Sequence, residues 1–162
     1  LSQKQLIAFN NNLVEVINID GVVDRFEWVM VSVLQKHLSV ILGNKKIKIK
    51  NALLSSYGSD VSCVIAALAY CGADSQEGAK LSFQRAVTSL GFNIQMPDIK
   101  TCVMKHVSDA LKNLQSLRFV DRGVFIGACE LCVAHDKTIT VVEAETIRAI
   151  GDILDCPIPM FT

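Results

Sequence analysis

Hydrophobic residues recur along most of this chain at the three- and four-residue spacing of a helix. The clearest case is segment 24–42, where one helical face carries Phe26, Val29, Met30, Val33, Leu34, Leu38 and Ile41. Side chains spaced in this way lie on the same side of an α-helix. Because Trp28 and Val31 add apolar surface on the other side, we predict that this helix is central to the fold.

The same spacing predicts further helices on both sides of that segment. Their expected ranges are 3–19, a short helix ending near residue 57, 59–72, 74–91, 97–114, 118–135 and 140–154. Residues 118–135 are apolar on nearly every side, so we predict that they form a second central helix. The stripe expected on helix 97–114 consists of Ile99, Val103, Val107, Ala110 and Leu114.

Local signals are expected to begin and end several of these helices. Gly72 and Gly91 are natural ends, because glycine readily adopts the left-handed conformation that follows a helix. Asp74 and Glu77 have the spacing of a capping box. Pro97 lies where a first helical residue is tolerated.

This arrangement predicts an all-α fold, a bundle of seven or eight helices. The Lys-Ile alternation at 45–50 is the one strand-like pattern, and it is too short and too charged to change the fold class. We interpret it as a solvated connector, with attraction to anionic lipid headgroups as the alternative. A chain of 162 residues, 51% hydrophobic and 20% charged, is expected to form a single packed domain over 1–162 without disulfides.

An acidic turn occurs once near each end of the chain. Residues 20–27 read DGVVDRFE, and residues 136–143 read DKTITVVE. In each copy a cap residue is followed three positions later by a glutamate, which is the spacing of a capping box. The cap and glutamate are Asp24 with Glu27 in the first turn, and Thr140 with Glu143 in the second.

The repeated turns predict a pseudo-symmetric bundle. Matching helix–turn–helix units are expected at its two ends, over about 3–42 and about 118–155. The middle helices, over about 47–115, would connect them.

The acidic residues of the turns offer an alternative interpretation as a cation site. Carboxylate oxygens are the ligands that calcium and magnesium prefer. The spacing does not match an EF-hand loop, so we favour capping and expect no bound metal. The candidate ligands under the alternative are Asp20, Asp24, Glu27, Asp136, Glu143 and Glu145.

A second possible metal site is the pattern C-x2-C-x2-H formed by Cys129, Cys132 and His135. Such spacing invites zinc. On a helix, however, the third residue points well away from the first, and no fourth ligand lies nearby in the sequence. We therefore expect these side chains to line a packing surface. Most of the six cysteines fall in apolar helical runs, which favours reduced, buried thiols in a cytosolic protein.

No grouping of residues in the sequence predicts catalysis. There is no Ser/His/Asp set, glycine-rich phosphate loop or HExxH pair. His37 and His106 lie beside apolar stripes, so we interpret them as core or boundary residues. The 16 basic and 16 acidic side chains leave no net charge, which argues against a nucleic-acid partner. The sequence also contains neither a long apolar run nor a signal peptide.

Two C-terminal stretches carry a resemblance to a known family. They are residues 122–136, RGVFIGACELCVAHD, and residues 143–157, EAETIRAIGDILDCP. They resemble the C-terminal region of bacterial membrane-bound zinc metallopeptidases, relatives of HtpX and the CAAX prenyl proteases. Residues 19–28 resemble the start of the same extension. Both acidic turns are also similar to the TerB-like helical domain of tellurite resistance, whose signature is an Asp-Gly turn before a helix bearing glutamates. The second turn departs from this signature, with Lys137 after Asp136.

The resemblance implies a TerB-like, non-catalytic module that follows the catalytic domain of a membrane peptidase. The absence of HExxH means that no catalytic role and no cofactor carry over to this chain, because the zinc would belong to the parent's catalytic domain. The module would regulate or bind its own peptidase domain or another protein. It would be a cytoplasmic domain of an inner-membrane protein, meeting the membrane only through the parent chain. The alternative is a free-standing, cation-sensing module of the tellurite-resistance type. A start at Leu1 rather than methionine leaves open that the chain is a piece of a longer protein.

Overall fold

All regular structure in the part of the chain that can be described is helical. The computed structural model describes residues 2–18, 31, 33–34, 36–38, 48–50, 52–136, 139–156 and 158, and no strand occurs among them. The prediction of an all-α fold is confirmed for these residues. The first acidic turn, with Asp20, Asp24 and Glu27, lies outside them, as do most of the predicted helix 24–42 and the side chain of Asp136.

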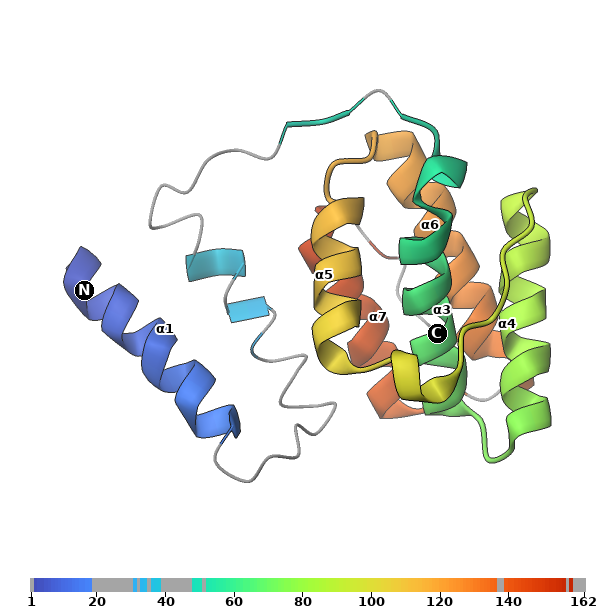
Figure 1. The fold of residues 1–162 in the computed structure, drawn as a ribbon, viewed down its shortest axis with the longest axis horizontal. Coiled ribbons are helices and arrows are strands. Elements are labelled where there is room, and N and C mark those ends of the chain that lie inside the picture. Colours follow the sequence, from blue (N-terminus) through green and yellow to red (C-terminus); the bar gives the residue numbers. More distant parts are fainter. Residues whose placement is uncertain are drawn as a thin grey trace. The chain divides into compact units, whose positions relative to one another are not determined.

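The chain divides into two compact units, Leu1–Ile47 and Lys48–Thr162 (Figure 1). The first unit contains α1 (Gln3–Asn18), close to its predicted range. Reciprocal bonds mark its start: the Ser2 amide donates to Gln5 Oε1 at 2.8 Å, and the Gln5 amide donates to Ser2 Oγ at 3.4 Å. This is the geometry of a capping box.

The second unit is a helical bundle arranged around one central helix, α3. Its elements are η1 (Leu54–Tyr57), α3 (Gly58–Gly72), α4 (Gln76–Leu90), η2 (Ile99–Thr101), α5 (Met104–Leu114), α6 (Phe119–Val133), η3 (Ala134–Asp136) and α7 (Val141–Ile153). Helix α3 packs against α4, α5, α6 and α7, and in Figure 1 it runs between α5 and α4. It takes this place because apolar and small residues cover most of its circumference; those buried include Val61, Val64, Ile65, Ala66 and Leu68.

Helix α6 buries more residues than any other described helix of the second unit except α3, and it packs against α3, α4 and α7, as expected of the second central helix that its sequence predicts. Phe125 and Ile126 are buried, but Val120 is 74% exposed, and Val124 and Leu131 are exposed as well. The predicted second central helix therefore has one face in the core and one exposed apolar face. An all-round apolar sequence does not distinguish a core helix from one with an apolar face in water, since folded proteins expose much apolar surface.

Two local signals also differ from their predictions. Helix α4 is capped by Ser75 rather than Asp74, because the Gly78 amide donates to Ser75 Oγ at 3.1 Å. Pro97 does not begin an α-helix: a 3-10 turn follows it, and α5 starts only at Met104. In contrast, Gly91 ends α4 with a φ of 73°, the left-handed conformation expected of it.

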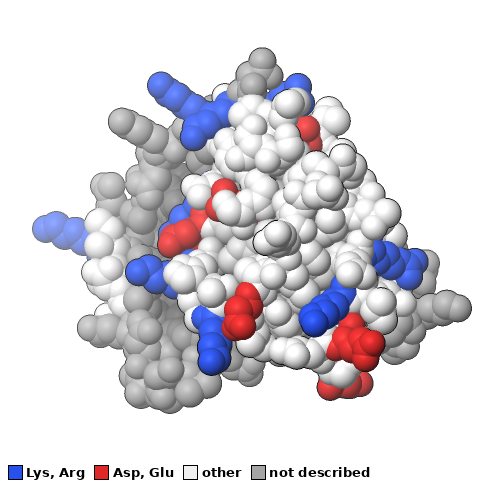
Figure 2. Space-filling model, turned by 45° about the vertical axis from the view of Figure 1, so that its right-hand side comes forward, with Lys and Arg blue, Asp and Glu red and all other residues white. Residues whose placement is uncertain are grey.

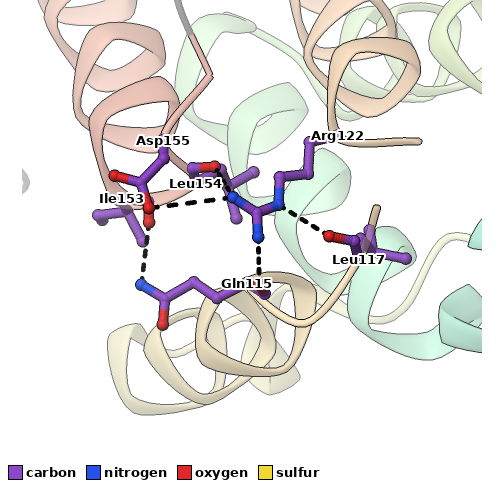
Figure 3. Close-up of polar contacts among 6 residues, drawn as sticks. All are labelled: Gln115, Leu117, Arg122, Ile153, Leu154 and Asp155. Atoms are coloured by element: carbon purple, nitrogen blue, oxygen red, sulfur yellow. Dashed lines mark hydrogen bonds and ion pairs between the residues drawn. The ribbon is translucent and has the colours of Figure 1, made fainter. Parts of the chain in front are cut away.

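A buried arginine joins the ends of three helices (Figure 3). Arg122 of α6 donates from Nε to Leu117 O at 3.0 Å, from Nη1 to Leu154 O at 2.5 Å and from Nη2 to Gln115 O at 2.6 Å. Its Nη1 also lies 3.9 Å from Asp155 Oδ2. The guanidinium thus satisfies three carbonyls that follow the ends of α5 and α7, groups that a helix cannot satisfy within itself.

The end of α7 is closed by backbone geometry. Asp155 adopts a positive φ of 51°, and the Cys156 amide returns to Gly151 O at 2.9 Å. This is the six-to-one bond of a Schellman motif. No helix among the residues that the structure describes is long and apolar enough to cross a membrane.

Candidate functional site

A pocket of about 190 Å³ lies where four helix ends of the second unit meet. The end of α3, the start of α4, the end of α6 with η3, and the start of α7 all contribute to its wall. Its polar lining includes Asp74, Ser75, Ser82, His135 and Glu143. The second acidic turn of the sequence therefore leads directly into this pocket.

Glu143 is the buried carboxylate of the pocket, with only 7% of its surface exposed. Its Oε2 accepts from the Thr140 amide at 2.8 Å and from Thr140 Oγ1 at 2.7 Å, and the Glu143 amide donates to Thr140 Oγ1 at 3.2 Å. The capping box predicted for this turn is confirmed. These bonds hold the carboxylate in one orientation at the start of α7.

The other oxygen of this carboxylate lies against Gly72. A Cβ added to Gly72 would overlap Glu143 Oε1. Because glycine has no side chain, the end of α3 can lie directly against the Glu143 carboxylate at the start of α7. No residue that the structure describes donates a hydrogen bond to Oε1. Glu143 thus brings to the pocket one oxygen that is bonded to Thr140 and one, Oε1, that lies against Gly72 and accepts no hydrogen bond from a described residue.

The thiol of Cys132 also lines the pocket, but its environment disfavours the reactive thiolate. Its Sγ lies 3.7 Å from Ile65 O. Burial, together with the nearby Glu143 carboxylate, raises the pKa of Cys132 to about 12. Because the thiolate is the reactive form, this cysteine is a poor nucleophile at neutral pH.

The C-x2-C-x2-H pattern is divided between the core and the pocket. Cys132 and His135 line the pocket, whereas Cys129 is fully buried and burial raises its pKa well above the ordinary value. The backbone oxygen of His135 accepts from Arg85 Nη1 at 3.5 Å. As expected from the helical spacing, the first and last residues of the pattern do not share one site.

The two candidate ligands of the second turn whose side chains can be described lie in different places. Glu143 is buried in the pocket, whereas Glu145 is partly exposed and forms an ion pair with Arg148. Within the part of the chain that the structure describes, no three His, Cys, Asp or Glu side chains are arranged to hold a metal ion.

Some features of the site and its surroundings were not visible in the sequence pattern. The sequence pattern predicts only a helix end at Gly72, and it gives no functional signal at Ser82. His106, expected in or near the core, is exposed, and its Nδ1 lies 2.8 Å from Thr101 O. The role of Gly72 depends on a tertiary contact with the start of α7, and no local sequence pattern marks such a contact.

No protein-family model, curated protein or solved structure matches this chain.

Proposed function

We propose that this chain is a non-catalytic, TerB-like interaction module that serves a membrane-associated zinc metallopeptidase. The observation that carries the proposal is the exposed apolar face of α6. Val120, Val124 and Leu131 are all exposed, and their spacing places them along one side of the helix. Phe119 adds a large exposed side chain at the start of the same helix. Contiguous apolar surface of this kind marks protein interaction sites.

The stretches that resemble the peptidase extension support the proposal, because they contain both buried residues that hold the bundle together and exposed apolar residues. Their cysteines Cys129, Cys132 and Cys156 are buried, and Arg122 connects helix ends. These residues build the bundle, which leaves Val124 and Leu131 of the same stretch for a partner. The partner would be the peptidase domain of the same protein or another protein, and the membrane would be met only through the parent chain.

The distribution of charge also suits a protein partner. Figure 2 shows one face of the molecule, and a broad area near the centre of that face shows neither basic nor acidic side chains. A nucleic-acid partner would instead favour clustered lysine and arginine.

Site-specific photocrosslinking tests the proposal in the cells that produce this protein. A benzoylphenylalanine at position 120 should crosslink to a peptide of a zinc metallopeptidase that contains HExxH, in the same chain or in another. Lys112 on α5 is highly exposed and serves as the control position. Val120→Asp should reduce co-purification of that peptidase about tenfold or more, because a buried charge opposes an apolar interface. Lys112→Asp should not. Crosslinks at position 120 to no peptidase, or equal effects of the two variants, would refute the proposal.

The second candidate function, a cation-sensing module of the tellurite-resistance type, is favoured by one observation only. The Glu143 carboxylate is held at the second acidic turn with one oxygen not bonded to a described residue. Its other oxygen is committed to Thr140, which supports a capping role. We expect calcium, magnesium and zinc to leave the melting temperature unchanged, because a ligand at 100 times its Kd would add about 2.7 kcal/mol. A metal-dependent rise that Asp20→Asn or Asp136→Asn abolishes would favour the sensing module.

A further inference from the structure

We propose that the pocket at Glu143 binds a primary alkylammonium group, the chemistry of a lysine side chain or a small free amine. This inference does not depend on the α6 face or on a peptidase partner. It rests on the charge of the pocket wall, on its shape and on a buried carboxylate with one oxygen, Glu143 Oε1, to which no described residue donates a hydrogen bond.

The charge of the wall selects a cation. Glu143 and Asp74 supply two carboxylates, and the described residues that line the pocket include no lysine or arginine. A carboxylate as buried as Glu143 is costly unless other groups compensate for its lost water. Two donors from Thr140 and the start of α7 compensate one side of it. An ammonium N–H at Oε1 would compensate the other.

The remainder of the wall suits an organic cation better than a metal ion. Leu68 and Val133 offer apolar contact for methylene groups, and the hydroxyl groups of Ser75 and Ser82 are acceptors for further N–H groups. The volume of about 190 Å³ is several times the roughly 30 Å³ that a water molecule occupies in the liquid. A metal ion would instead need several converging ligands, and no set of three is arranged for one in the described part of the chain.

An NMR titration of the full chain with n-butylammonium chloride tests the inference. We expect saturable shifts at the amides of Gly72, Gly78 and Glu143, which all border the pocket. Matched n-butanol and sodium chloride titrations should not produce them, since neither supplies an ammonium donor. The same shifts with n-butanol, or no saturable shift with the amine, would overturn the proposal.

Glu143→Gln is the decisive variant, because glutamine can keep the capping box while it removes the charge. We expect it to weaken n-butylammonium binding about tenfold or more, which corresponds to about 1.4 kcal/mol. Glu145→Gln makes the same change on the same helix outside the pocket and should have no effect. Equal affinities of wild type and a folded Glu143→Gln variant would refute the ammonium site.

Asp74→Asn provides the test if Glu143→Gln does not fold. Asp74 is exposed at the pocket, so its substitution should preserve the fold and weaken amine binding about two- to threefold. Unchanged affinity in this variant would then count against the proposal. Displacement of the amine by calcium, magnesium or zinc, with the same shifts, would show a metal site instead.

A second ligand distinguishes the two sources of the ammonium group. A blocked Gly-Lys-Gly peptide should bind more tightly than n-butylammonium if the pocket receives the lysine of a partner protein. Tighter binding of the free amine would indicate a small metabolite. In either case, acetylation of the lysine should abolish binding, because it removes the charge. Binding of the acetylated peptide with undiminished affinity would contradict the inference.

Discussion

The close approach of Gly72 to Glu143 leaves no room for a side chain at position 72 unless the Glu143 carboxylate shifts. Gly72→Ala would force either the carboxylate or the end of α3 to move. We expect a loss of about 1–3 kcal/mol in the free energy of unfolding, the usual cost of overpacking. Gly123→Ala is the matched control, because a Cβ there meets nothing within 4 Å. It should stabilise α6 by about 0.5–1 kcal/mol, since alanine favours a helix interior over glycine. Urea denaturation that shows the same sign for both variants would contradict this account.

Arg122 is the second residue whose contribution can be isolated. Arg122→Met keeps much of the apolar stem but leaves three carbonyls without their donor. We expect a loss of about 2–4 kcal/mol in urea denaturation, because unsatisfied buried acceptors are expensive. Arg118→Met, four residues earlier, removes an exposed arginine paired with Asp121 and should cost much less, because exposed ion pairs contribute little to stability. Similar losses for the two variants would show that the carbonyl contacts carry little energy.

These residues show which part of a site the sequence can predict. Thr140 and Glu143 were predicted as a capping box because the partners lie three positions apart and the motif is local. Gly72 and Arg122 meet partners far away in the chain. For Arg122 those partners are backbone carbonyls, which every residue carries and no sequence pattern marks.

At the scale of elements, helix α6 has one face in the core and one in water. Phe125 is fully buried, so Phe125→Ala should cost about 3–5 kcal/mol. Leu131 is 36% exposed, so Leu131→Ala should cost clearly less. Thermal or urea denaturation of the two variants measures the difference. A larger loss for Leu131→Ala would place that residue in the core after all.

The element boundaries follow the sequence where a local signal decides them. Gly91 ends α4 because of its backbone freedom, and α7 begins at its capping box. The α-helix predicted over 97–103 does not form. Ile99 and Val103 have the spacing of a helical stripe, but both lie on the surface. Burial of a face depends on the neighbouring helix, and the period of a sequence does not contain that information.

At the scale of the whole molecule, the second unit places its two candidate surfaces on different parts of one bundle. The exposed α6 residues Val120 and Val124 belong to the half of that helix near the Arg122 cluster. The pocket lies at the opposite end of α6, beside η3 and the start of α7. The apolar face also includes Leu131, one residue before the pocket-lining Cys132, so a partner that docks along the whole face reaches the same end of α6 as the pocket. A lysine on such a partner would join the two proposals.

The buried thiols make the stability of the second unit depend on alkaline pH. Burial raises the pKa of Cys132 from its ordinary value of 9.0 to about 12. Between these values the unfolded chain has lost this proton and the folded chain has kept it. Stability from this group is therefore complete below pH 9 and is lost as pH rises toward 12.

The size and source of that slope can be measured. Urea denaturation of wild type between pH 9 and pH 11 should show a falling free energy of unfolding, and Cys132→Ala should make the slope shallower by up to about 1.4 kcal/mol per pH unit. Val133→Ala removes a neighbouring buried side chain that does not ionise. Val133→Ala should lower the free energy of unfolding by the same amount at every pH and leave the slope unchanged, because the cost of a cavity does not depend on ionisation. A slope that Cys132→Ala does not alter would show that the thiol deprotonates as readily in the folded chain as in the unfolded one. Burial by α3 and α7 would then not shield it from water as the packing indicates.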